Sequence, residues 1–168
     1  TDNTSAVVRE FTKKYPFIKL IDQPNGGKAS AVNAALDLAV GDLFAVIDAD
    51  SRVDKHAIKV LVPHFNNEKT GAVISRIRVD APKNFLERMQ RFEYIMSSLT
   101  RLLMRNFGTL AITHGVLSMF RTSTLRQVGG FVKDKNNLTE DFEIALRMRR
   151  HGYTVEMEPC AVGYTCVP

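Results

Sequence analysis

The apolar positions of this chain switch between a helical period and short continuous runs. Spacings of three and four residues predict helices over 4–14, 28–40, 58–65, 84–105, 122–128 and 140–150. Short apolar runs predict strands over 17–21, 43–47 and 71–79, with an extended stretch near 110–120. Alternating helices and strands favour an α/β fold with a mainly parallel sheet, in which ligands bind beyond the carboxyl ends of the strands.

The run 43–47 is apolar at every position and has an acidic residue close to each end. This pattern is typical of a strand buried on both faces, as in a parallel sheet. Three residues mark helix ends. Gly41 suits the position after the second predicted helix, Pro63 should end or kink the third, and Gly152 should cap the last.

The longest helical pattern, 84–105, carries one apolar stripe with basic residues beside it. The stripe consists of Phe85, Met89, Phe92, Ile95, Met96, Leu99, Leu102 and Leu103, and its basic flanks are Arg88, Arg91, Arg101 and Arg105. A stripe of this width predicts a helix that packs on the core. The basic flanks leave a second interpretation open, a helix that lies at a membrane surface or lines the path of a polymer.

Composition narrows the class of protein. The chain has 168 residues, 45% of them hydrophobic and 24% charged, which fits one globular domain or a large piece of one. It contains two cysteines, too few for a disulfide scaffold or for a four-cysteine zinc site. The net charge of +5 favours anionic partners such as nucleotides, although a solvated basic surface would look the same.

Two aspartates follow the apolar run 43–47 at once, as Asp48-Ala49-Asp50. In extended chain, residues two apart point the same way, so the two carboxylates can converge. Neighbouring carboxylates repel unless a cation lies between them, and Mg²⁺ binds one or two carboxylates together with phosphate oxygens. The pattern therefore indicates metal-assisted departure of a phosphate or diphosphate. An isolated D-x-D also occurs as two solvated acids at the end of a strand.

Two further motifs lie on either side of this one. Upstream, Asn25-Gly26-Gly27-Lys28 places a lysine at a helix start, behind glycines that let backbone approach a ligand, without the spacing of a Walker A loop. Downstream, Thr139-Glu140-Asp141 opens a helix, where Thr139 suits the N-cap and the acids complement the helix dipole. A carboxylate held there could also accept a proton from a hydroxyl group. A Gly-rich turn and a helix cap are the ordinary structural explanations.

The ordered set of motifs resembles glycosyltransferase family 2. The set comprises N-G-G-K-A-S-A-V-N-A-A-L, D-A-D, H-G-V-L-S-M-F-R, T-E-D and R-H-G-Y, in that order. The likeness is to the processive branch, with its poly-N-acetylglucosamine, hyaluronan, chitin and cellulose synthases, and it extends to Gln90 and Glu93-Tyr94. Each motif is weak alone, but the set covers nearly the whole chain and is specific.

The resemblance implies a GT-A fold and a reaction. The expected donor is a nucleotide-sugar, usually a UDP-sugar, the acceptor is a hydroxyl of a sugar or growing polysaccharide, and a Mg²⁺ or Mn²⁺ ion assists. Transfer would invert the anomeric carbon in a single displacement. Asp141 is similar to the catalytic base that deprotonates the acceptor hydroxyl, and Glu140 would help to shape that site.

The resemblance also implies which residues surround the donor. Asp50 would be the firmer metal ligand, and Asp48 would help to hold the nucleotide and the metal. Lys28 is similar to the family lysine near the diphosphate, and Asn33 of the same motif is expected in the donor site. The sugar or acceptor pocket would be formed by His114, Gly115 and Thr139, with His114 as a hydrogen-bonded pocket residue rather than a metal ligand.

Two departures from the family bear on the organisation of the chain. Family members begin with two strands and a D-G-S-T-D-like turn for the nucleobase, of which Thr1-Asp2-Asn3-Thr4 resembles only the end. The Q-x-x-R-W motif and the membrane helices expected after Pro168 are also missing. We therefore expect 1–168 to be one partial catalytic domain of a larger synthase at the cytoplasmic face of a membrane, attached through the missing segments and inactive alone. Exposed sheet edges would favour a homodimer.

Two other functions fit part of the pattern. A haloacid-dehalogenase-like phosphotransferase also carries D-x-D after a buried strand, but Arg52 stands where that class has Thr or Val, and Asp48 lies far from the N-terminus. A non-catalytic binding module would fit the basic charge. The sequence has no Trp and no recognised nucleic-acid motif, so we expect no nucleic-acid partner.

Overall fold

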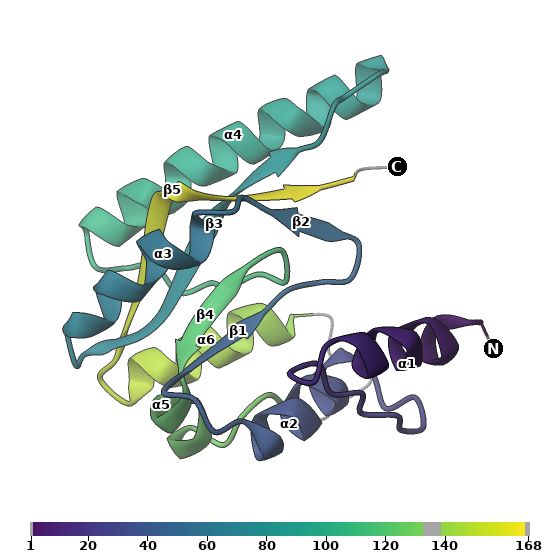
Figure 1. Cartoon of the computed structure of the whole chain (residues 1–168). Helices are drawn as coiled ribbons and strands as arrows, with labels where there is room; N and C mark the ends of the chain where they lie inside the picture. Colours follow the sequence, from purple (N-terminus) through teal and green to yellow (C-terminus); the bar gives the residue numbers. More distant parts are fainter. Residues whose placement is uncertain (1, 133–138, 167–168) are drawn as a thin grey trace.

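The computed structural model describes residues 2–132 and 139–166 and is built around one five-stranded sheet (Figure 1). The strands are β1 Leu43–Val46, β2 Ser51–Val53, β3 Thr70–Val79, β4 Ser118–Arg121 and β5 Thr154–Thr165. Their order across the sheet is β1-β4-β3-β5-β2, so the two long strands β3 and β5 lie side by side near its middle.

The sheet is mixed rather than mainly parallel, which corrects one detail of the predicted α/β fold. Only β3 and β5 pair in parallel, while β4 pairs antiparallel with both β1 and β3, and β2 pairs antiparallel with β5. Apolar patterning reports how deeply a strand is buried but not the direction in which it runs, because the connections decide the direction. The α/β class itself is confirmed.

The predicted helices all form. They are α1 Thr4–Lys14, α2 Lys28–Leu38, α3 Ala57–Leu61, α4 Phe85–Asn106, α5 Thr122–Gln127 and α6 Glu140–Arg150. Pro63 ends α3 as expected, and the chain continues as the 3-10 helix η1 Val62–Asn66. Gly152 follows α6 with a φ of 85°, the left-handed conformation that a glycine adopts after a helix.

Three local predictions are wrong. The segment 17–21 forms no strand within the described residues, and Phe17 remains 81% exposed. Strand β1 lies at the edge of the sheet and none of its residues is fully buried, so it is not the doubly covered strand that its apolar run predicts. Helix α2 ends at Leu38, and Ala39 is already extended, so Gly41 does not occupy the C′ position. The first two expectations required neighbouring elements that do not cover these segments here, whereas the third fails because the helix ends earlier than its apolar pattern predicts.

The core lies on both faces of the sheet. Ala72 and Ile74 of β3 pack with residues of α2, α5 and α6, whereas Val73 packs with residues of α3 and η1. Successive residues of a strand point to opposite faces, which explains how one strand serves both clusters. The sheet thereby fixes α2 and α6 on the same side, which places the first residues of both helices near the end of β1 (Figure 1).

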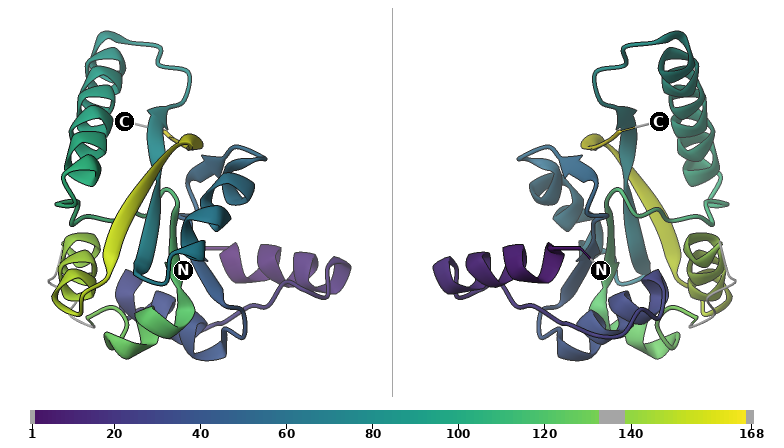
Figure 2. Two further views of the ribbon diagram at one scale, coloured as in Figure 1. Left: turned by 90° about the vertical axis from the view of Figure 1, so that its left-hand side faces the viewer. Right: turned by 90° about the vertical axis from the view of Figure 1, so that its right-hand side faces the viewer.

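Helix α4 runs along β3 and β5, on the opposite side of the molecule from α1 (Figure 2). Seven of the eight residues of its apolar stripe are exposed, from 47% at Ile95 and Met96 to 74% at Phe85, and Ser98 is its only buried residue. Leu102 is the exception, because it is half-buried and packs against the core. The prediction that the stripe as a whole packs on the core is therefore wrong. The basic flanks also differ from expectation, because Arg105 turns to the sheet and its Nε donates to Glu156 Oε2 at 3.0 Å. Within the described residues, no helix has the length and hydropathy needed to cross a bilayer.

Candidate active site

Four charged residues from three separate motifs meet at one place. The ammonium group of Lys28 lies 2.9 Å from Asp48 Oδ1. It lies 4.0 Å from both Glu140 Oε1 and Asp141 Oδ2. One lysine therefore stands between the D-x-D aspartate and the T-E-D acids. We call Lys28, Asp48, Glu140 and Asp141 the acidic cluster.

Local structure explains how each member reaches this place. Gly27 adopts a φ of 83° as the N-cap of α2, which lets the chain turn sharply before Lys28 begins the helix. Asp48 lies two residues after the end of β1, and its backbone N–H donates to Gly115 O at 2.7 Å. Glu140 and Asp141 are the first two residues of α6, where the helix dipole favours acidic side chains.

The D-x-D segment is a turn and not the extended chain that was expected. The N–H of Ser51 donates to Asp48 O at 3.0 Å and closes this turn. Asp48 is held by Lys28, whereas Asp50 is exposed and accepts from the Ser51 hydroxyl at 3.3 Å. The alternation of side chains along a strand therefore does not apply to these two residues.

The two carboxylates of the D-x-D segment are ligands of the kind that bind a divalent cation together with phosphate. Mg²⁺ is commonly held by one or two carboxylates, with water and phosphate oxygens completing its shell. Asp48 and Asp50 supply two such carboxylates, and the Lys28 ammonium shows that Asp48 already pairs with a cation. In the described parts of the chain no group of three or more His, Cys, Asp or Glu side chains could hold a metal by itself.

Gly115 is required where the cluster meets the sheet. A Cβ atom on this residue would overlap both Asp48 Oδ2 and Lys28 Nζ. Lys28 Nζ and the other oxygen of the same carboxylate, Asp48 Oδ1, form the closest ion pair of the cluster, so a side chain at this position would displace the ends of both partners. Gly115 thus lies at the acidic cluster, as expected for a residue of the sugar pocket.

The charges of the cluster shift one another's protonation. Burial raises the pKa of Asp141, as do the neighbouring carboxylates Glu140 and Asp48, while the positive charge of Lys28 opposes the rise. Burial alone would lower the pKa of Lys28, but its hydrogen bond to Asp48 and the charges of the three acids raise it. Asp141 is thus a carboxylate with increased proton affinity beside a firmly protonated lysine.

His114 is buried next to Gly115 and is neutral. Burial, assisted by the positive charges of Arg101 and Lys28, lowers its pKa from 6.5 to about 3. Its Nε2 lies 2.9 Å from the Ser75 carbonyl oxygen, which can only accept, so Nε2 carries the proton. His114 is therefore a buried, hydrogen-bonded residue beside the cluster, and its place in a sugar pocket stays a prediction.

Two of the expected site residues have other tasks. Asn33 is buried, and its amide donates to Phe131 O at 2.7 Å and accepts from Phe131 N at 2.9 Å. Both the oxygen and the nitrogen of this side-chain amide are bonded to the backbone of Phe131. Asn33 therefore holds the segment at Phe131 in place and does not offer these atoms to a nucleotide-sugar. Thr139 is the N-cap residue of α6, and its main-chain oxygen accepts from the N–H groups of Phe142 and Glu143.

Two residues at the site were not expected from the sequence. Arg101 was assigned to the basic flank of α4, but it is half-buried and its charge acts on Asp141 and His114. Tyr94, Ser98 and Arg101 recur at helical spacing, and this polar face was the signal that could have placed Arg101 inside. Thr113 contacts Asp141 through both its amide and its hydroxyl, and nothing in its sequence neighbourhood indicates this.

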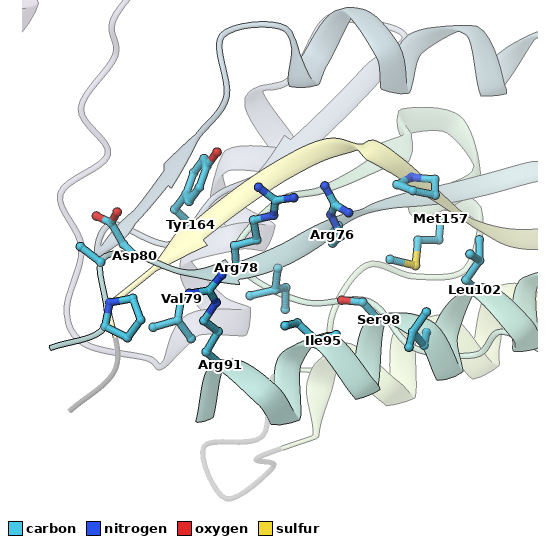
Figure 3. A pocket seen from close by; sticks show the side chains of 15 residues that line it. Arg76, Arg78, Val79, Asp80, Arg91, Ile95, Ser98, Leu102, Met157 and Tyr164 are labelled. Carbon is cyan, nitrogen blue, oxygen red and sulfur yellow. The ribbon is translucent and has the colours of Figure 1, made fainter. Parts of the chain in front are cut away.

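A hollow lies between α4 and strands β3 and β5 and has a volume of about 600 Å³. Figure 3 shows Ile95, Ser98 and Leu102 of α4 facing the strands across it. None of the four residues of the acidic cluster lines this cavity, so it is separate from the candidate active site.

Comparison with known proteins agrees with this geometry. The profile of a family described as "Glycosyltransferase like family 2" matches residues 1–166. A probable glycosyltransferase of Bacillus subtilis, YdaM, is 34% identical over 175 residues, covering 100% of this chain and 41% of the relative. The poly-beta-1,6-N-acetyl-D-glucosamine synthase of Staphylococcus aureus is 30% identical over 172 residues, with the same coverage.

A solved structure has a similar fold. The mannosyltransferase PcManGT from Pyrobaculum calidifontis, determined in complex with GDP-Man and Mn²⁺, superimposes with a TM-score of 0.77 at 25% identity. The match covers 100% of this chain and 45% of the mannosyltransferase. The chain therefore spans less than half the length of these relatives.

Proposed function

Because this chain belongs to glycosyltransferase family 2, we propose that its acidic cluster transfers a sugar from a nucleotide-sugar to a hydroxyl group of a saccharide acceptor. The observation that supports this most is the position of Lys28 between Asp48 and Asp141. Asp48, the proposed cation ligand, and the half-buried carboxylate of Asp141 are thereby adjacent, as a leaving group and an attacking hydroxyl require.

Asp141 is proposed as the general base. It would accept the proton of the acceptor hydroxyl while the oxygen forms a bond to the anomeric carbon and the bond from that carbon to the diphosphate breaks. Attack from the side opposite the diphosphate inverts the anomeric carbon. Burial raises the pKa of Asp141 towards the working range of a base at neutral pH, which supports this role.

The other side of the cluster would bind the donor. Lys28 offers its ammonium to the diphosphate, at a helix start where anions are favoured. Asp48 and Asp50 would hold Mg²⁺ or Mn²⁺, whose charge offsets the charge that develops on the departing diphosphate. The similar mannosyltransferase was solved with GDP-Man and Mn²⁺, which supports a nucleotide-sugar and a divalent ion here.

The names of the relatives suggest a donor to test, and the exposed face of α4 suggests a setting. UDP-N-acetylglucosamine is the first donor to test, because several relatives are named poly-beta-1,6-N-acetyl-D-glucosamine synthases, and the acceptor would then be a growing polysaccharide. We place the reaction at the cytoplasmic face of a membrane. The exposed apolar stripe of α4, with exposed Arg88 and Arg91 beside it, supports contact with an acidic lipid surface.

Calorimetric titration of UDP, with and without Mn²⁺, tests the donor side. We expect Mn²⁺-dependent binding that Asp48→Asn weakens at least tenfold, because the variant loses a charged ligand. Asp37→Asn is the matched control, since Asp37 is exposed on α2 outside the cluster. Asp141→Asn should keep UDP binding and lose sugar transfer, measured with radiolabelled UDP- and GDP-sugars.

Each alternative has a distinct result. Binding of GDP in place of UDP would indicate a GDP-sugar as the donor, and the proposed sugar transfer would still stand. Acid-labile phosphorylation of Asp48 would indicate a phosphotransferase. Salt-sensitive nucleic-acid binding without any response to UDP and Mn²⁺ would indicate a binding module and contradict the proposal.

A further inference from the structure

A short buried segment, Thr113 to Gly115, connects the two halves of the acidic cluster. At one end, the N–H of Thr113 donates to the main-chain oxygen of Asp141 at 3.1 Å, and the Thr113 hydroxyl donates to the same oxygen at 2.8 Å. At the other end, Gly115 O accepts from the N–H of Asp48 at 2.7 Å. The D-x-D turn and the start of α6 are thus tied to the same three residues.

The middle of the segment is anchored as firmly as its ends. His114 N donates to Ser118 Oγ at 2.9 Å, and its Nε2 donates to Ser75 O at 2.9 Å on β3. Thr113 is 1% exposed, so its hydroxyl exchanges little with water. A displacement of Asp141 relative to Asp48 would require this anchored segment to move.

We propose that Thr113 is a positioning residue for the proposed transfer reaction, whose hydroxyl holds Asp141 in place and keeps its carboxylate ready to accept a proton. The inference rests on the proposed function, because it assigns Thr113 to the base of that reaction. Thr113 makes two hydrogen bonds to the main-chain oxygen of Asp141. A substitution leaves the bond from the backbone N–H in place and can remove only the bond from the hydroxyl.

The hydroxyl matters because Asp141 is surrounded by charges of both signs. Lys28 faces it from α2, Arg101 from α4, Asp48 from the turn after β1 and Glu140 from its own helix. Burial raises the pKa of Asp141, and the positive charge of Lys28, 4.0 Å from its carboxylate, opposes the rise. The Thr113 hydroxyl holds the main-chain oxygen of Asp141, so its loss should let the carboxylate move away from Lys28 and favour the protonated acid, which cannot act as a base.

The test compares Thr113→Val, which removes the hydroxyl and keeps the shape, with Thr113→Ser, which restores the donor. Thr124→Val is the matched control, because Thr124 is equally buried but its hydroxyl has no hydrogen-bond partner within the described residues. The ¹³C resonance of the Asp141 carboxyl, assigned with Asp141→Asn, is followed through a pH titration. We expect Thr113→Val to titrate at higher pH than the wild type, and Thr113→Ser and Thr124→Val to titrate with the wild type.

Kinetics give a second measurement. Thr113→Val should lower kcat about tenfold with little change in KM for the donor. It should also move the acidic limb of the kcat profile to higher pH. An Asp141 titration and a kcat profile that are unchanged in Thr113→Val would overturn the inference. If Thr113→Val does not fold, Thr113→Ala replaces it with the same expectation.

The two proposals can fail separately. Because residues 1–168 are expected to be inactive alone, transfer is measured with the longer protein that contains them, and the proposed function fails if no nucleotide-sugar supports transfer by that protein. The carboxyl titration still shows whether Thr113 sets the state of Asp141 in that case. If transfer occurs and the titration of Asp141 does not respond to Thr113→Val, only the role of Thr113 is rejected.

Discussion

Gly115 shows how one residue sets the geometry of the acidic cluster. Its missing side chain leaves the space in which Lys28 and Asp48 form their ion pair. The requirement concerns close approach rather than backbone conformation, because Gly115 is not among the residues with positive φ. A change at this position should therefore act on the site first and on folding second.

Gly115→Ala should weaken the binding of UDP in the presence of Mn²⁺ about tenfold, because the added methyl group pushes Asp48 away from Lys28. Titration calorimetry measures the affinity. Gly41→Ala is the control, since a Cβ atom there would meet its nearest atom at an ordinary 3.5 Å. Equal affinities for the two variants would show that the ion pair is not part of the donor site.

Helix α4 forms where the sequence predicts it, but most of its apolar face is exposed to solvent. Its N-cap is Asn84, whose side chain accepts from Glu87 N at 2.8 Å, and its length agrees with the apolar pattern. The stripe, however, is directed to the outside, and the polar Arg101 is directed to the acidic cluster. Periodicity shows that a helix has two faces, but not which of them the rest of the molecule covers.

Exposed apolar residues of α4 should bind acidic vesicles. Replacing Phe92 and Leu99, which are 58% and 52% exposed, by Gln should reduce binding to phosphatidylglycerol-containing vesicles about tenfold, because less apolar surface enters the lipid. Sedimentation with vesicles measures the effect. Ile58→Gln on α3 is the control, with 42% exposure at a different face. Concentration-dependent self-association without vesicle binding would instead assign the stripe to a second copy of the chain.

The molecule as a whole is held by contacts between distant parts of the chain. Asn33 on α2 binds both the N–H and the carbonyl group of Phe131. Arg126 of α5 donates to Leu36 O and Ala39 O, which satisfies carbonyl groups at the end of α2. These hydrogen bonds fix α2, and with it Lys28, relative to the helices that follow β4.

Asn33→Ala should lower the free energy of unfolding by about 2–3 kcal/mol, because it leaves two buried backbone groups of Phe131 without partners. Urea denaturation followed by circular dichroism measures the change. Asn106→Ala, at an exposed position at the end of α4, should change stability much less. A small effect of Asn33→Ala would mean that water replaces the lost hydrogen bonds.

The sequence by itself determined the helices, the strand β3, and the presence of three charged motifs, because periodicity and capping are local properties of the chain. The segment 17–21 and the run at β1 were misjudged since a strand depends on what lies beside it. The order of the motifs was sufficient to indicate the family, which the match over residues 1–166 confirms.

Only the tertiary structure decided which side chains meet. In the structure, Asn33 binds the backbone of Phe131 and the D-x-D segment forms a turn. Arg101 and Thr113 both lie near Asp141. Such contacts join residues far apart in sequence, and their geometry depends on the packing of the sheet and helices together. A residue type indicates what chemistry is available, whereas distance and burial decide which residues can carry it out.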